Sequence, residues 1–100
     1  RGNSMTLLQE LKDYLKITWK NEDVYLESII ERGKSYIKGL TGTEINFERE
    51  GLSKSLLLDF CRYYYNNASE YFEESYRAQI VRLQYQEAIR VSREVAEDEE

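Results

Sequence analysis

Two pairs of neighbouring carboxylates come closest to a catalytic or metal-binding arrangement in this sequence: Glu22 with Asp23, and Glu73 with Glu74. Paired carboxylates can act as general acid and base, or can hold a divalent cation. Both pairs, however, fall where a helix is expected to begin, and negative side chains there complement the positive end of the helix dipole. We therefore interpret both pairs as helix-start residues and assign them no catalytic or metal role.

The sequence also offers few candidate nucleophiles and no phosphate-binding loop. The chain has no histidine, which excludes the usual catalytic triads and the zinc sites that contain histidine. Its single cysteine, Cys61, lies within an apolar stripe, so we predict a buried and unreactive thiol. The five glycines are isolated from one another and form no phosphate-cradling loop. We predict that the protein is not an enzyme and uses no cofactor.

The distribution of charge bears on binding to nucleic acid. Arg77 and Arg82 could contact phosphate, but Arg77 can also pair with Glu73, an acid four residues away. Five of the 19 acidic residues lie in 94–100, so residues 1–93 hold 14 acids and 14 bases. A dedicated nucleic-acid binder needs a basic face that displaces counterions from phosphate. This balance therefore argues against that class of protein.

The elements that position these residues are predicted to be helices. The sequence has no proline, and 33% of its residues are charged, a composition that favours helix over sheet. Apolar residues recur at a helical period over 6–16, 22–40, 53–67 and 70–92, with Thr6, Asn21 and Ser53 as N-caps. No apolar run approaches the roughly 18 residues of a membrane span. We predict an all-α bundle of about four helices with a long C-terminal helix.

The segment 56–72 is the most apolar and aromatic of the chain, and we predict that it forms the central helix of the bundle. Gly33 lies in the middle of a predicted helix, which indicates a close approach by a neighbouring helix. Gly42 is predicted to take the left-handed conformation that ends that helix. The side chains expected in the core are Leu11, Leu15, Ile29, Ile30, Tyr36, Leu57, Phe60, Cys61, Tyr64, Phe72, Ile80 and Leu83.

Residues 43–51 are predicted to form the one extended loop. Ile45 and Phe47 alternate there with polar residues, so they either dock on the bundle or pair with another subunit. Together with Tyr63 they are the candidate contacts between subunits. We expect residues 1–4 to be a remnant of an expression tag, 5–92 to be one helical domain, and 93–100 to be a frayed acidic tail.

Two blocks of the sequence resemble a known family, the head–tail connector (adaptor) proteins of tailed bacteriophages and prophages. The first block runs Leu8-x-x-Leu11-Lys12-x-Tyr14-Leu15-Lys16-Ile17, then Asp23-x-Tyr25-Leu26-x-x-Ile29-Ile30, then Tyr36-Ile37-x-x-Leu40-Thr41-Gly42. The second runs Leu57-Leu58-x-x-x-Arg62-Tyr63-x-Tyr65-Asn66, then Glu70-x-Phe72, Tyr76 and Ile80-x-x-Leu83-Gln84. The resemblance covers residues 8–84, and its specificity comes from the order and spacing of the pieces.

This resemblance implies a structural protein that forms a ring beneath the portal and joins the DNA-filled head to the tail or to the next neck protein, a stopper or tail-completion protein. DNA would only pass through the lumen, without specific binding, and no membrane would be involved. The protein would belong to the virion, at the head–tail interface, and would be in the cytoplasm of the bacterial host during assembly. By the same resemblance, the C-terminal segment would contact the portal through Ile89, Arg90, Val91, Arg93 and Val95.

The alternative hypothesis is a small helical DNA-binding or regulatory module of the helix-turn-helix type. Such a module needs a recognition helix with basic and amide side chains gathered on one exposed face. The last predicted helix carries such residues, but Glu73, Glu74 and Glu87 dilute them. The candidate recognition residues are Arg77, Arg82, Gln84, Gln86 and Arg90.

Overall fold

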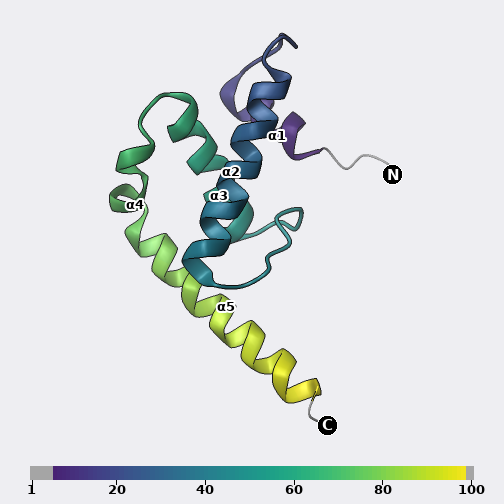
Figure 1. The fold of residues 1–100 in the computed structure, drawn as a ribbon, viewed down its shortest axis with the longest axis vertical. Helices are drawn as coiled ribbons and strands as arrows, with labels where there is room; N and C mark the ends of the chain where they lie inside the picture. The colour runs from purple at the N-terminus through teal and green to yellow at the C-terminus, as the bar shows by residue number, and fades with distance from the viewer. Residues whose placement is uncertain (1–5, 99–100) are drawn as a thin grey trace.

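The structure is a computed structural model that describes residues 6–98, and over this range it is helical with no strand, as predicted. Figure 1 shows α2 and α3 side by side, α1 packed near one end of α2, and α5 running out of the bundle as a long arm. The predicted tag remnant, residues 1–4, lies outside the described residues. The elements are α1 Leu7–Leu15, α2 Asp23–Thr41, α3 Leu52–Tyr65, the 3-10 turn η1 Ser69–Tyr71, α4 Phe72–Ser75 and α5 Arg77–Asp98.

Helix α3 is the central element, because it contacts α1, α2, η1 and α5. Its buried face carries Leu56, Leu57, Phe60 and Cys61, at the three- and four-residue spacings of one helical stripe. Most of the expected core side chains are buried, and three lie only partly buried at the edge of the core, namely Leu15, Tyr36 and Tyr64. The remaining nine, all buried, are Leu11, Ile29, Ile30, Leu57, Phe60, Cys61, Phe72, Ile80 and Leu83.

The prediction of one continuous helix over 70–92 is wrong. The chain breaks at Tyr76, whose φ of −115° and ψ of 23° are not helical, so that α4 and α5 are separate. Phe72 is fully buried, and Tyr76 stacks on it with ring centroids 4.8 Å apart. The packing of these two rings determines the path of the chain here, and it outweighs the tendency of the segment to continue as one helix.

Helix α5 also extends beyond the predicted end at residue 92, to Asp98. Arg90 contributes to this length, because it binds Glu87 and Glu94, three and four residues away on the same helix, at 2.7 Å each. The segment predicted as a frayed tail is therefore helical through Asp98, and residues 99–100 lie outside the described range.

Of the four residues predicted to begin or end helices, two have the predicted role in the structure and two do not. Thr6 caps α1 as predicted, since its hydroxyl accepts a hydrogen bond of 3.1 Å from the Gln9 amide. Gly42 ends α2 in the left-handed conformation with φ of 71°. Asn21 and Ser53 are not N-caps. Helix α2 begins at Asp23, which binds Lys12, and α3 begins directly after Gly51, whose φ of 148° favours glycine.

Gly33 lies where α2 and α3 approach closely, as predicted. A Cβ atom added to Gly33 would lie 2.7 Å from Leu57 Cδ1 and 2.9 Å from Phe60 Cδ2. Gly39, on the same helix, is exposed and has nothing within 4 Å of the corresponding position. The two glycines therefore differ in packing while sharing the same helical backbone.

We expect Gly33→Ala to lower the free energy of unfolding by about 1 kcal/mol or more, because the cost of overpacking, about 1–3 kcal/mol, exceeds the gain in helix propensity. Gly39→Ala is the matched control and should raise it by about 0.5–1 kcal/mol, since only propensity changes there. Urea unfolding of both variants measures the difference. Equal stabilisation by the two substitutions would contradict the close approach at Gly33.

Candidate interaction surfaces

Three of the groups considered for chemistry, Cys61, Glu22 and Glu73, are buried or hydrogen-bonded within this fold. Cys61 is fully buried, and burial raises the pKa of its thiol to about 12. Glu22 accepts hydrogen bonds from Trp19 and Tyr65, and Glu73 accepts one from Tyr36. Within residues 6–98 there is no group of three potential metal ligands, and no helix is long and apolar enough to cross a membrane. Two surfaces of the described fold could bind other proteins.

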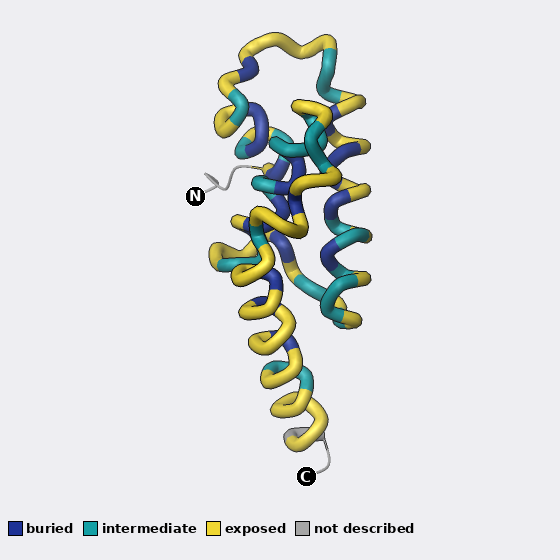
Figure 2. The backbone as a smooth tube through the Cα atoms, turned by 90° about the vertical axis from the view of Figure 1, so that its left-hand side faces the viewer, coloured by how far each residue is buried: buried dark blue, intermediate teal, exposed yellow. Residues whose placement is uncertain are grey.

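The first such surface lies on α5. Ile80, Leu83 and Glu87 face the bundle and are buried, whereas the opposite side of the helix is exposed and appears yellow along most of α5 in Figure 2. Small and apolar residues recur on that opposite side at alternating spacings of three and four, which keeps them on one face. This outer face of α5 consists of Ala78, Val81, Tyr85, Ala88, Ser92 and Val95.

Three of these side chains are large and apolar yet strongly exposed. Tyr85 is 70% exposed, Val81 56% and Val95 51%. Two arginines, Arg77 and Arg82, flank the first half of the face, and among the described residues neither forms an ion pair with an acidic side chain. The outer face of α5 is therefore apolar along its centre and basic at its margin.

A set of hydrogen bonds, which we call the latch, joins Gln84, Glu87 and Arg90 of α5 to the loop 43–51 and to the end of α2. Glu87 is 8% exposed, and it accepts a hydrogen bond of 2.7 Å from the Thr43 hydroxyl and another from Arg90. Arg90 also donates to the Glu44 carbonyl oxygen at 2.7 Å, and Gln84 donates to the Leu40 carbonyl at 2.8 Å. Thus Arg90, predicted to contact the portal, is engaged within its own chain. The sequence contained only the spacing of Glu87 and Arg90 as a signal for this latch.

The latch should contribute to stability in a pH-dependent way. Its hydrogen bonds, above all the one from Arg90, hold the pKa of Glu87 below its usual value. A carboxyl whose pKa is lower in the folded state stabilises the fold above its unfolded pKa of about 4.3, and this contribution is lost as pH falls through the folded pKa. We expect Glu87→Gln to cost about 1–3 kcal/mol at pH 7 and progressively less as the solution is acidified.

Guanidinium unfolding of the wild type and Glu87→Gln at pH 7 and pH 3 measures this prediction. Glu94→Gln is a matched control, because Glu94 binds the same arginine but is 58% exposed. It should change stability by less than about 0.5 kcal/mol. An effect of Glu87→Gln that is equally small at both pH values would contradict the role of the latch.

The side chains predicted to contact another subunit pack against residues of their own chain. Phe47 is only 3% exposed and belongs to the core, so its prediction as a subunit contact is wrong. Ile45 is partly buried against the same core. Tyr63 packs edge-on against Phe72 and Tyr76, with ring centroids 5.8 and 5.6 Å apart. The loop 43–51 docks on its own bundle and turns its charged residues outward.

A second candidate surface is a hollow of about 340 Å³ between the start of α1, the middle of α2 and the loop 43–51. Leu7 and Ile30 are buried beneath it and Leu8 is partly buried. Three exposed acids and one lysine surround these apolar side chains. We call this feature the acidic hollow; its charged lining residues are Glu27, Glu31, Lys34 and Glu48.

Comparison with protein families gives a match to this chain. The family model described as "Phage gp6-like head-tail connector protein" matches residues 5–96, which is nearly the whole chain. Comparisons with curated proteins and with solved structures find no match. The matched range includes the acidic hollow, the latch and the outer face of α5.

Proposed function

The chain belongs to the family of phage gp6-like head-tail connector proteins, and from this we propose that it forms a ring that docks on the portal and joins the DNA-filled head to the tail or to the next neck protein. In this role it is a structural component of the virion and catalyses no reaction. It assembles in the cytoplasm of the bacterial host. DNA passes through the lumen of the ring without specific binding.

The structural feature that supports this proposal is the exposed end of α5, which we call the arm. Among the described side chains, Arg90 forms the last hydrogen bond that joins α5 to the loop 43–51, and residues 92–96 are all exposed. Val91 is partly buried, whereas Ile89 is 38% exposed and Val95 51% exposed. We therefore assign the portal contact to Ile89, Arg93 and Val95, with Arg90 holding the arm in place.

Electron microscopy of the protein mixed with its portal tests the proposal. The expected result is a ring of added density at the tail-facing side of the portal. A second sample that also contains the next neck protein should show further density beyond that ring. Portal particles that stay bare at saturating concentrations of this protein would contradict the proposed function.

The alternative, a DNA-binding module, makes a different prediction for binding to duplex DNA. The nearly neutral body of 14 acids and 14 bases in residues 1–93 releases few counterions. We expect binding no tighter than the non-specific range, a Kd of about 1 μM or weaker at about 150 mM salt. Fluorescence anisotropy with a labelled duplex measures this, and sub-micromolar binding with a steep salt dependence would favour the DNA-binding module.

A further inference from the structure

The part of the outer face of α5 around Tyr85 is not explained by the fold or by the portal contact. Tyr85 and Val81 lie one helical turn apart and are 70% and 56% exposed, so they do not serve the core. Among the described residues the Tyr85 hydroxyl forms no hydrogen bond. Arg82 lies beside them and is also exposed. An aromatic ring, an aliphatic side chain and a cation are thus presented together.

The acidic hollow presents the complementary chemistry. Leu7, Leu8 and Ile30 supply an apolar floor, and Glu27 and Glu31 supply negative charge on the exposed side of α2. Among the described residues that line the hollow, Lys34 alone offsets these acids, and its ammonium nitrogen lies 3.4 Å from a carboxylate oxygen of Glu31. A hollow with an apolar floor and an acidic rim suits an apolar side chain that arrives with a neighbouring cation.

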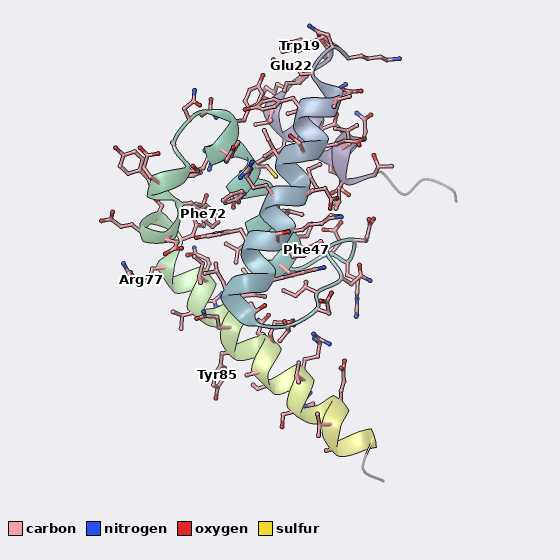
Figure 3. All side chains as sticks on the ribbon, in the orientation of Figure 1. Trp19, Glu22, Phe47, Phe72, Arg77 and Tyr85 are labelled. Carbon is pink, nitrogen blue, oxygen red and sulfur yellow. The ribbon has the colours of Figure 1, made fainter. Side chains whose placement is uncertain are left out.

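The two surfaces lie on opposite sides of the molecule. In Figure 3, Arg77 and Tyr85 point to the left of α5, whereas Phe47 marks the loop on the right. In Figure 1, the start of α1 and this loop both lie to the right of α2, and these are the elements that bound the acidic hollow. A single chain therefore cannot bring its own Tyr85 into its own hollow.

We propose that Val81 and Tyr85 of one subunit seat in the acidic hollow of the next subunit in the ring, with Arg82 facing Glu27 and Glu31. This inference rests on the proposed function, because a ring repeats one heterologous contact between two different faces until it closes. The contact uses the first half of the outer face and leaves Arg93 and Val95 for the portal. The partner is a second copy of this chain, since each copy carries both complementary surfaces.

Substituting the aromatic residue gives the first test. Tyr85→Ser should weaken association between subunits tenfold or more, as expected for an aromatic residue at the centre of an interface. Tyr71→Ser is the matched control, because Tyr71 is also a strongly exposed tyrosine, at 58%, but lies on η1. Sedimentation velocity up to about 1 mM and electron microscopy of portal-bound rings are the measurements. Thermal unfolding verifies that both variants stay folded.

Charge reversal gives a sharper test of which surfaces meet. Arg82→Glu places an acid against the acidic hollow, and the double variant Glu27→Arg/Glu31→Arg places bases against Arg82. Each variant alone should fail to assemble into rings. An equal mixture of the two should assemble, because each α5 then meets a hollow of opposite charge in an alternating ring.

The outcomes separate this inference from the proposed function. Rings that form normally with Tyr85→Ser, or that are not restored by mixing the charge variants, would overturn the pairing while leaving the connector function standing. Self-association that depends on Tyr85, without capture by the portal, would support the pairing and overturn the proposed function. A wild-type protein that forms no ring in solution or on the portal would overturn both.

Discussion

Replacing Phe60 by alanine is expected to lower the free energy of unfolding by about 3–5 kcal/mol, the usual cost of truncating a buried aromatic residue. Phe60 is 6% exposed, and its ring stacks on Tyr36 at 4.9 Å and packs edge-on against Phe72 at 5.4 Å. It also lies against Gly33, where α2 and α3 approach closely. The substitution therefore leaves a cavity where α2, α3 and α4 meet.

A loss of this size is large for such a small domain, because the total stability of a domain is about 5–15 kcal/mol. Denaturant unfolding gives the magnitude, and Cys61 supplies a second measurement on the same molecule. Its buried thiol should react with a thiol reagent only through opening of the fold, so labelling should be slow in the wild type and much faster in Phe60→Ala.

Tyr71→Ala is the control for the Phe60 variant, since Tyr71 is an aromatic residue that is 58% exposed. Its stability should stay within about 0.5 kcal/mol of the wild type. A cost below about 1 kcal/mol for Phe60→Ala, or rapid labelling of Cys61 in the wild-type protein, would contradict the central position of α3.

The features that could be predicted from the sequence are those that depend on local periodicity. The all-α class and the close approach at Gly33 follow from residues three and four apart on one helix. The resemblance to the connector family, which rests on the order of such helical pieces, is confirmed by the match over residues 5–96. Each of these features can be recognised from residues close together in the sequence, or from the order of such short pieces along the chain.

The features that could not be predicted depend on residues far apart in the sequence. The break at Tyr76 follows from aromatic packing in which Phe72 also meets Tyr36, with ring centroids 6.1 Å apart. The latch joins Thr43 to Glu87, and these two residues are separated in the sequence by α3, η1, α4 and the first half of α5. Neither contact leaves a periodic pattern, so the sequence contains no sign of it beyond the spacing of Glu87 and Arg90.

The candidate subunit contacts illustrate the same limit. Alternation of apolar and polar residues at Ile45 and Phe47 was compatible with docking on the bundle and with pairing between subunits. The structure places Phe47 in the core, so the loop is tied inward. Tyr85, in contrast, belonged to a helical pattern and gave no sequence signal of its own, yet it is among the most exposed apolar side chains.

Removing residues 92–100 is expected to abolish or strongly weaken capture of this protein by the portal while leaving the bundle folded. The deleted segment includes Arg93 and Val95, whose side chains are exposed, so little core is lost. The latch residues Glu87 and Arg90 remain, and Arg90 loses only its exposed partner Glu94. We expect stability to change by less than about 1 kcal/mol, within the usual range for surface changes.

Capture of the truncated protein by immobilised portal rings, compared with the wild type, measures this prediction, and a tenfold or larger loss of affinity is expected for a segment that carries two of the three assigned contacts. The double variant Arg93→Glu/Val95→Asp in the full-length chain should reproduce the loss without shortening α5. Tyr85→Ser should retain capture of single subunits, because its site lies on the first half of the outer face. Unchanged capture of the truncated protein would show that the arm does not contact the portal. Unfolding of the truncated protein would show that the end of α5 stabilises the bundle.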